Sequence, residues 1–488
     1  MSRPLEDFHY EQPIKPRGLK GESIDIFRRY AHQRGLSIQE IDQIAQRLAV
    51  DVAIARGESN LPTGKGTFII HPRDMDLLPI QSSTAKLGNG LLKAPVGPGR
   101  DLKDIAKRNG EFHDVKHHFP GLQDLSLSEQ LDVYSHHPFS LQAAYIDSNG
   151  QTLGYVMGSG LLLGEMAAIR AQSLGSKNRS IKRVADYVNG ILLSDIYTAR
   201  EAGILSPDSV VGLSMTLPGP TDYGRTLKES LDINSVTGHE LTSYYANQTL
   251  IEASHRLGYN LASNSVGLMG AGIMGASIAR EIFNTKSANG LVIYDKNPDK
   301  ATALASEINQ IYGVPTRVVG SYKELIASTT PIVTATNNLA PSYHLEPDAN
   351  GIFHNFAVED SQPPAFYGDS QAPLFGVVST LPTGISRVEI ISGQASNNIY
   401  GYGQEGLLSS NEAIAGFTCE SQLLTALISR GSVPFNNGPA NPDSINNWTQ
   451  SARQVGVGLP KDLQFRGYRV DTDQIRFSPQ SSDLQVSP

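Results

Sequence analysis

Three glycines, Gly270, Gly272 and Gly275, have the spacing G-x-G-x-x-G. The apolar residues 266–269 before them predict a strand, and residues 273–283 after them predict a helix. In such a turn the first glycine permits a tight bend, the second lets the backbone approach a pyrophosphate, and the third lets the helix pack closely on the strand. Backbone N–H groups and the positive end of the helix dipole then face the phosphates. We therefore expect a dinucleotide-binding loop formed by Gly270, Ala271, Gly272, Ile273, Met274 and Gly275.

An acidic residue follows the next predicted strand. Residues 291–294 are apolar, and Asp295 comes directly after them, 20 residues beyond Gly275. A carboxylate at this point accepts hydrogen bonds from the ribose hydroxyls and repels a 2′-phosphate, which favours NAD over NADP. Lys296 follows at once and would pair with such a phosphate, so both coenzymes stay open.

A third predicted strand, residues 331–338, ends in small polar residues. Because parallel strands end at the same edge of their sheet, we expect Thr336 and Asn337 beside the nicotinamide half of the coenzyme. Over about 75 residues from Ser265, predicted strands and helices alternate, which is typical of a parallel sheet with crossover helices. The expected fold class is α/β, with an α+β substrate domain followed by a doubly wound Rossmann-type domain.

The other segments indicate how the chain is divided. Apolar residues recur at helical spacing over 38–56, and turn residues at 148–150 separate two strand-like flanks within 143–158. We expect four parts: a helical extension at 1–66, the substrate domain at 67–258, the NAD(P)-binding domain at 259–430, and a C-terminal helix with a flexible tail at 431–488.

Charge and composition argue against several classes of protein. The chain has 40 basic and 48 acidic residues, a net charge of −8, so we expect no nucleic-acid partner. No secretory signal is visible, and the most apolar stretch, 155–169, is too interrupted to span a membrane, so we expect a cytoplasmic protein. The chain contains one cysteine, and the adjacent histidines at 117–118 and 136–137 lack ligand spacing, so we expect no metal site.

The order of the predicted domains, together with several short motifs, resembles the long-chain acyl-[acyl carrier protein] reductases. The motifs lie between about Thr67 and Pro460 and read FIIHP, GYVMGSGLLLGEM, SVTGHELTSYYANQTLIEAS leading into SVGLMGAGIMG, AGFTCESQLLTAL and ARQVGVGLP. The resemblance implies that hydride from a reduced nicotinamide converts an acyl thioester to an aldehyde, after a cysteine has accepted the acyl group. It also implies a small-molecule or carrier-linked acyl substrate, with an acyl carrier protein as a candidate partner.

The position of the cysteine departs from the family's pattern. The segment 376–384, which corresponds to the family's cysteine, has none, and Ser379 and Thr380 there are poor nucleophiles without a partnered base. Cys419 lies about 40 residues further on, among apolar neighbours. It is either a small buried hydrophobic residue or the nucleophile.

The candidate catalytic residues are Glu165, His239 and Cys419. The resemblance places a glutamate at Glu165, where a desolvated carboxyl group would exchange a proton, although an acid facing water at a helix start explains it equally well. His239 precedes the helix that leads into the nucleotide domain and would donate to a carbonyl oxygen from the cleft between domains, unless it is a surface or capping histidine. The polar loop 222–225 either lines the substrate entrance or is a solvated turn.

Three functions stay open at this point. The first is an NAD(P)H-dependent acyl-thioester reductase. The second is an NAD-dependent dehydrogenase or imine reductase on a small hydroxy or amino substrate, because GLMGAGIMG also resembles the turns of hydroxyacid dehydrogenases. The third is a protein that senses a nucleotide or binds a partner without catalysis.

Overall fold

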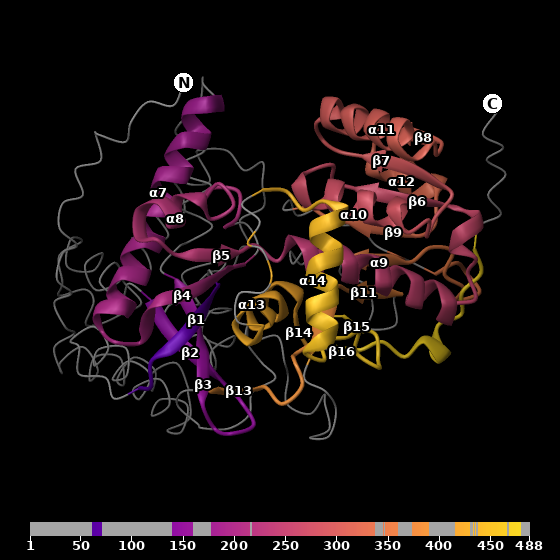
Figure 1. The fold of residues 1–488 in the computed structure, drawn as a ribbon. Coiled ribbons are helices and arrows are strands. Elements are labelled where there is room, and N and C mark those ends of the chain that lie inside the picture. Colours follow the sequence, from indigo (N-terminus) through magenta and orange to yellow (C-terminus); the bar gives the residue numbers. More distant parts are fainter. Residues whose placement is uncertain are drawn as a thin grey trace, which may run out of the picture.

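In this computed structural model two six-stranded sheets, A and B, lie side by side with helices between them (Figure 1). The structure describes residues 61–70, 139–159, 177–214, 217–336, 345, 347–359, 373–389, 415–429, 433, 435, 438–465 and 468–479. The predicted helix at 38–56 and most of the predicted tail lie outside these residues.

Sheet A has the strand order β13-β2-β3-β1-β4-β5. Its strands are β1 (Gly64–Ile70), β2 (Phe139–Ile146), β3 (Thr152–Ser159), β4 (Leu205–Leu213), β5 (Asn234–Val236) and β13 (Ser386–Glu389). Strands β3, β1, β4 and β5 run parallel, and β2 and β13 add an antiparallel edge. The predicted hairpin is confirmed, because β2 pairs with β3 across a turn that contains Gly150 at φ 78°.

Sheet B is parallel throughout and has the order β11-β10-β9-β6-β7-β8. Its strands are β6 (Ser265–Met269), β7 (Gly290–Tyr294), β8 (Thr316–Val318), β9 (Ile332–Thr334), β10 (Ala357–Glu359) and β11 (Leu374–Gly376), with α10 (Ile273–Asn284), α11 (Pro298–Tyr312) and α12 (Tyr322–Ser328) as crossovers. The order reverses between β6 and β9, so this sheet is doubly wound. The predicted α/β class with a Rossmann-type domain is confirmed.

Local sequence explains where the crossover helices begin and end. Helix α11 starts with Pro298 after Asn297, whose side chain accepts a hydrogen bond from the Asp299 N–H at 3.1 Å. It ends at Gly313, which takes a left-handed φ of 67°. In α12 the Ser321 hydroxyl caps the Glu324 N–H at 3.1 Å. These residues fix where the two crossover helices begin and where α11 ends.

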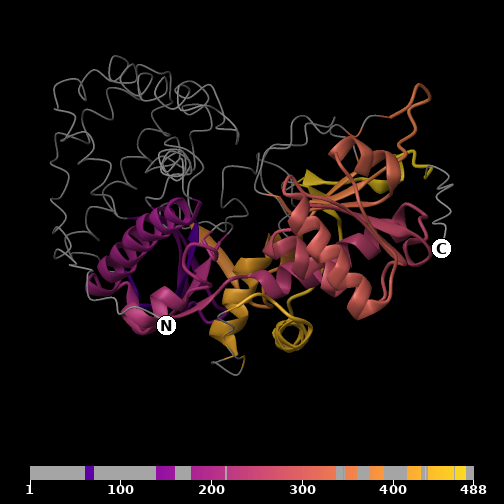
Figure 2. The same cartoon turned by 90° about the horizontal axis from the view of Figure 1, so that it is seen from above.

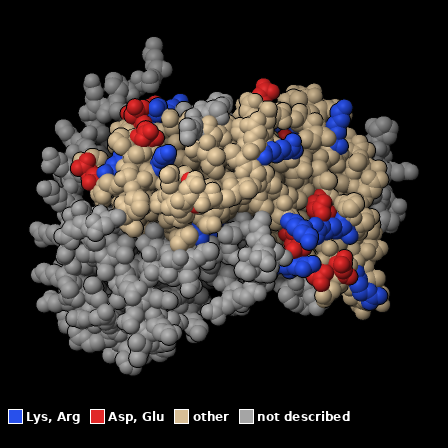
Figure 3. All heavy atoms as spheres, turned by 60° about the horizontal axis from the view of Figure 1, so that its bottom comes forward, with Lys and Arg blue, Asp and Glu red and all other residues tan. Residues whose placement is uncertain are grey.

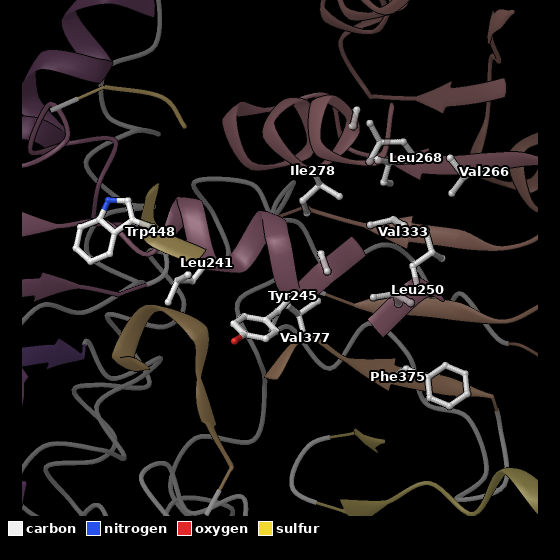
Figure 4. Close-up of a cluster of buried hydrophobic side chains, with 14 of the residues drawn as sticks. Leu241, Tyr245, Leu250, Val266, Leu268, Ile278, Val333, Phe375, Val377 and Trp448 are labelled. Carbon is white, nitrogen blue, oxygen red and sulfur yellow. The ribbon is translucent and has the colours of Figure 1, made fainter. Parts of the chain in front are cut away.

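Three helices lie between the two sheets: α9 (His239–Arg256), α13 (Thr418–Ile428) and α14 (Pro442–Gln454). Helix α9 packs on α10, α13 and α14, while α13 also covers β1 and β4 of sheet A, as the view from above shows (Figure 2). One continuous apolar core therefore runs from sheet A to sheet B. Figure 4 shows part of it, with Leu241, Tyr245 and Leu250 of α9 among the labelled side chains.

A second core lies on the other face of sheet A, under α7 (Lys177–Glu201) and α8 (Arg225–Leu231). The smaller elements are η2 (Leu261–Ser263), β12 (Val378–Thr380), β14 (Ala415–Phe417), β15 (Gln464–Phe465), β16 (Tyr468–Arg469) and η3 (Thr472–Gln474). The chain enters sheet B after β5 and returns to sheet A at β13, so sheet A is built from segments on both sides of sheet B in the sequence. The four-part division of the chain stays a prediction.

The surface charges and the helices of the described residues bear on the expected partners. On the face drawn in Figure 3, basic and acidic side chains of the described residues are interspersed. Within the described part of the chain, no helix is long and apolar enough to cross a membrane. The same part contains no group of three or more His, Cys, Asp or Glu side chains placed to hold a metal ion.

Candidate functional site

The glycine loop connects β6 to α10 at the carboxyl edge of sheet B. Gly270 has a φ of 101°, and a Cβ added there would lie 2.5 Å from the Ala335 carbonyl oxygen. A Cβ on Gly275 would overlap the carbonyl oxygen of Gly270. The fold itself therefore requires glycine at these two positions.

Gly272 is different, because its surroundings in the protein do not require glycine. Its φ of −75° suits any residue, and an added Cβ would meet no atom within 4 Å. It is also the N-cap of α10, where the helix N–H groups and the positive end of the dipole point outward. The open space beside Gly272 fits a pyrophosphate that approaches the backbone closely.

Asp295 joins the end of β7 to this loop. Its carboxylate accepts hydrogen bonds from the Ala271 N–H and the Asn297 N–H, both at 2.7 Å. Each carboxylate oxygen keeps a lone pair for a further donor, such as a ribose hydroxyl. Lys296 next to it is exposed. Asp295 therefore holds the glycine loop in place and remains able to bind a sugar.

The other predicted coenzyme residues lie around the same edge. Ile273 begins α10 with its side chain 42 % exposed, and Met274 is half-buried behind it. Thr336 follows β9 and is half-buried, while Asn337 lies outside the described residues. Thr336 is thus at the carboxyl end of the strand beside β6, across the point where the strand order reverses.

The candidate catalytic residues His239 and Cys419 are brought together by the fold, whereas Glu165 lies outside the described residues. His239 is the first residue of α9 and Cys419 the second of α13. Gly238, before His239, has a φ of 78°, and a Cβ added there would overlap Cβ of Cys419. The two helices therefore begin at one point. We call this point the helix junction and define it by Gly238, His239, Thr418 and Cys419.

Polar contacts between α9 and α13 hold the junction together. The hydroxyls of Thr242 and Thr418 share a hydrogen bond. The Gln422 amide accepts from the Leu241 N–H at 3.2 Å and donates to the Glu240 carboxylate at 2.8 Å. These side chains are buried, so the contacts fix how the two helices meet.

A buried ion pair ties the start of α13 to sheet A. The guanidinium group of Arg387 in β13 donates to both carboxylate oxygens of Glu420, at 2.9 and 2.6 Å, and the Tyr145 hydroxyl donates to the same carboxylate at 2.8 Å. The Arg387 and Glu420 side chains are 1 % and 0 % exposed. A bidentate pair with a third donor offsets the cost of burying both charges and fixes the residue that follows Cys419.

His239 is uncharged at neutral pH. Burial lowers the pKa of its imidazole from 6.5 to about 4, and its Nδ1 atom has no hydrogen-bond partner among the described residues. The ring packs edge-to-face on Tyr223, with 5.8 Å between ring centroids. Tyr223 belongs to the polar loop 222–225 and takes a φ of 57°, rare for a bulky side chain. The loop therefore contacts a candidate catalytic residue.

The helix junction and the glycine loop lie at the same edge of sheet B. Strand β12 follows β11 after one residue and pairs with β14, so that Val378 is opposite Phe417, the residue before α13. Strands β9 and β10 separate this point from β6, a distance of about 14 Å at 4.8 Å per strand spacing. The two halves of a dinucleotide bind on opposite sides of the reversal point. With the adenosine at Asp295, the junction lies on the nicotinamide side.

Ser379, Thr380 and His354 make hydrogen bonds that hold the fold together. The Ser379 hydroxyl donates to the Ser421 hydroxyl at 2.8 Å, and the Thr380 hydroxyl accepts from the Gly458 N–H at 2.8 Å. His354 precedes β10, at the edge of sheet B opposite the glycine loop, where it contacts the Ser478 carbonyl at 2.7 Å. Sequence reasoning missed Ser214, a buried serine directly after β4, because only the pairing of β4 with β5 brings it to the junction.

Residues 265–340 match the model of the family described as NADP oxidoreductase, coenzyme F420-dependent. Together with the loop geometry, this match makes this part of the chain an NAD(P)-binding, Rossmann-type domain of the oxidoreductase class. A search of curated proteins found no match.

Solved structures that match parts of this chain include three oxidoreductases. The Thermococcus litoralis Δ1-pyrroline-2-carboxylate reductase in complex with NADH and L-proline has 17 % identity and a TM-score of 0.20, and the match covers 25 % of this chain and 36 % of that one. The Escherichia coli D-lactate dehydrogenase has 15 % identity and a TM-score of 0.23, and the match covers 37 % of this chain and 58 % of that one. The Rhodotorula graminis D-mandelate dehydrogenase has 13 % identity and a TM-score of 0.22, and the match covers 63 % of this chain and 76 % of that one. The chain thus spans less than two thirds of the length of the first two.

Proposed function

We propose that this protein is an NAD(P)H-dependent oxidoreductase that reduces an acyl thioester to an aldehyde, with Cys419 as the acyl acceptor. The observation that carries the proposal is the close approach of Cys419 to Gly238, the residue before His239, where α9 and α13 begin. A thiol suits this reaction because it exchanges with a thioester and leaves again after reduction.

The bonds made and broken in this reaction balance. The Cys419 sulfur forms a bond to the acyl carbon, and the thiol of the incoming thioester leaves with a proton. Bound NAD(P)H supplies the hydride that reduces the acyl carbon. The bond from that carbon to Cys419 then breaks, which releases the aldehyde and returns the thiol after it takes up a proton. Neutral His239 donates a hydrogen bond to the substrate oxygen during these steps.

Asp295 supports a preference for NAD(H) in this proposal. Its carboxylate lies beside the glycine loop, bonded to the Ala271 N–H at 2.7 Å, where a 2′-phosphate would meet a negative charge. The lysine that follows is exposed, and the Asp295 carboxylate accepts its hydrogen bonds from the backbone N–H groups of Ala271 and Asn297. The NADH-to-NADPH ratio of catalytic efficiency tests this preference directly.

The acyl reductase proposal is tested with purified protein, NADH or NADPH, and acyl thioesters of short, medium and long chain. We expect oxidation of the nicotinamide, seen by absorbance, together with one aldehyde and one thiol released per coenzyme oxidised. Cys419→Ser should abolish this reaction while coenzyme binding stays unchanged. If the wild-type protein oxidises neither coenzyme with thioesters of any chain length, the proposal is refuted.

A second candidate is a dehydrogenase or imine reductase without a covalent intermediate. One observation favours it: the hydroxyls of Ser379 and Thr380, in the segment that corresponds to the family's cysteine, are engaged in structural hydrogen bonds. His239 would then donate directly to a substrate carbonyl or imine. Full activity of Cys419→Ser on small hydroxy or amino substrates would identify this reaction and exclude the thiol as nucleophile.

A further inference from the structure

We infer that the Ser214 hydroxyl and the first turn of α13 form the site that binds the carbonyl oxygen of the substrate's acyl group. This inference rests on the proposed function and assigns a residue to it that no motif indicates. The ligand is an uncharged carbonyl whose oxygen becomes negative when the sulfur or the hydride adds to the carbon.

The strand register places Ser214 at the helix junction. The pairing of β4 with β5 ends with Gly212 opposite Val236, and continuing this register by two residues brings Ser214 level with Gly238. A Cβ on Gly238 would overlap Cβ of Cys419. Ser214 therefore lies one strand spacing, about 4.8 Å, from the residue on which the start of α13 rests.

The alternation of side chains along β4 points Ser214 toward α13. A Cβ on Gly212 would lie 3.2 Å from Cβ of Leu423, so the Gly212 side of the sheet faces α13. Residues two apart on a strand share a face, which puts Ser214 on this side. Leu423 is four residues after Cys419, about one helical turn, and Ser214 is two residues nearer than Gly212 to the carboxyl edge.

The Ser214 hydroxyl is available for a ligand. The side chain is 0 % exposed and its Oγ has no hydrogen-bond partner among the described residues. Its N–H donates to the Ile69 carbonyl at 3.3 Å, which holds the backbone in line with β1. A buried hydroxyl without a partner is costly, so its presence calls for a group that it can bond.

The first turn of α13 supplies the complementary field. Its N-cap is Phe417, an apolar residue that makes no side-chain cap, and the turn is buried at Thr418 and Glu420. The first N–H groups of a helix lack partners within the helix and carry partial positive charge. The Glu420 carboxylate does not cancel this charge, because Arg387 binds it at 2.9 and 2.6 Å. The junction thus favours an oxygen that gains negative charge during the reaction.

The test compares Ser214→Ala with a matched control in the same strand. Ser209 in β4 is 1 % exposed, and its hydroxyl also lacks a partner among the described residues, but it lies in the middle of the strand, five residues before Ser214. We expect Ser214→Ala to lower kcat for acyl-thioester reduction by 10²–10³-fold with KM little changed. Ser209→Ala should keep the wild-type kcat. Ser214→Thr, which retains the hydroxyl, should recover part of the loss.

Two further measurements separate a catalytic role from a structural one. Ser214→Ala should leave the NADH dissociation constant and the rate of Cys419 alkylation unchanged. A long-chain trifluoromethyl ketone, which forms a tetrahedral adduct with a thiol, should bind the variant more weakly by about the factor lost in kcat.

The outcomes distinguish this inference from the proposed function. If the wild-type protein reduces thioesters and Ser214→Ala stays within twofold of its kcat, the hydroxyl bonds only buried water and the inference is overturned, while the proposed function stands. Equal losses in Ser214→Ala and Ser209→Ala overturn it as well, because they would reflect packing. A wild-type protein that reduces no thioester refutes both.

Discussion

The position of Gly272 leads to a prediction that separates coenzyme binding from folding. Replacing Gly272 by Ala places a methyl group where the protein has no atom within 4 Å, on a residue whose φ of −75° suits alanine. Alanine has fewer accessible backbone conformations than glycine in the unfolded chain, which stabilises the folded variant by about 0.4–1 kcal/mol. The poorer N-cap costs a similar amount, about 0.5–1 kcal/mol. The free energy of unfolding should therefore change by less than about 1 kcal/mol.

The same methyl group should block the coenzyme. It occupies the space through which a pyrophosphate reaches the N–H groups at the start of α10, and each charge-assisted hydrogen bond lost costs about 1.5–3 kcal/mol. Loss of two such bonds raises the dissociation constant at least 100-fold. Calorimetric titration with NADH measures the affinity, and thermal or urea unfolding measures the stability.

Gly275→Ala is the control, because its added Cβ overlaps the Gly270 carbonyl oxygen. Two rigid parts of the backbone must then move, so we expect this variant to lose about 1–3 kcal/mol of stability. The two variants thus have opposite patterns: Gly272→Ala folds normally and binds poorly, while Gly275→Ala folds poorly. If Gly272→Ala binds both NADH and NADPH like the wild type, the pyrophosphate does not lie at this loop and the argument is wrong.

Three more predictions follow from the contacts described above. Asp295→Asn should weaken NADH binding about 10-fold by titration and reduce the NADH-to-NADPH preference, because the amide loses one acceptor shared by the loop and the ribose; an unchanged preference would count against a ribose contact. Arg387→Met should lower the free energy of unfolding by about 3–5 kcal/mol since it leaves Glu420 buried without its cation, whereas Arg280→Met, at the part-exposed pair with Glu307, should cost about 1 kcal/mol or less in the same denaturant titration. Equal losses would contradict the argument from burial. Burial lowers the folded-state pKa of His239 to about 4, below the unfolded value near 6.5. Its contribution of about 3 kcal/mol to the free energy of unfolding is therefore fully present above pH 6.5 and is lost as pH falls toward 4. The free energy of unfolding measured from about pH 4 to 7 should show this slope, and His239→Gln should remove it.

The nucleotide domain could be predicted from the sequence because its signals are local. The glycines, the flanking strand and helix, and Asp295 all lie within about 30 residues, and the geometry of a parallel sheet fixes their relation. Gly270 and Gly275 are required by close backbone contacts that the pattern itself specifies. The bond from Asp295 to the Ala271 N–H was not predicted.

The helix junction could not be predicted, because it depends on contacts between distant parts of the chain. Gly238 and Cys419 are about 180 residues apart, and their meeting follows from the packing of α9 on α13. The sequence around Gly238 does not indicate which distant residue will pack against its left-handed backbone. Cys419 has apolar neighbours in the sequence, which favoured a buried hydrophobic role, but it is only half-buried at the second position of its helix. No sequence motif marks Ser214 as a functional residue, and its place follows only from the register of β4 and β5.

The return of the chain to sheet A has a consequence for how the protein is made. During synthesis, β1 to β5 leave the ribosome well before β13 and α13. Strand β13 completes the edge of sheet A, and α13 covers β1 and β4. A nascent chain that stops after sheet B therefore leaves Phe68 and its neighbours uncovered and lacks the thiol of Cys419. The helix junction is therefore completed last, after the glycine loop of sheet B has been synthesised.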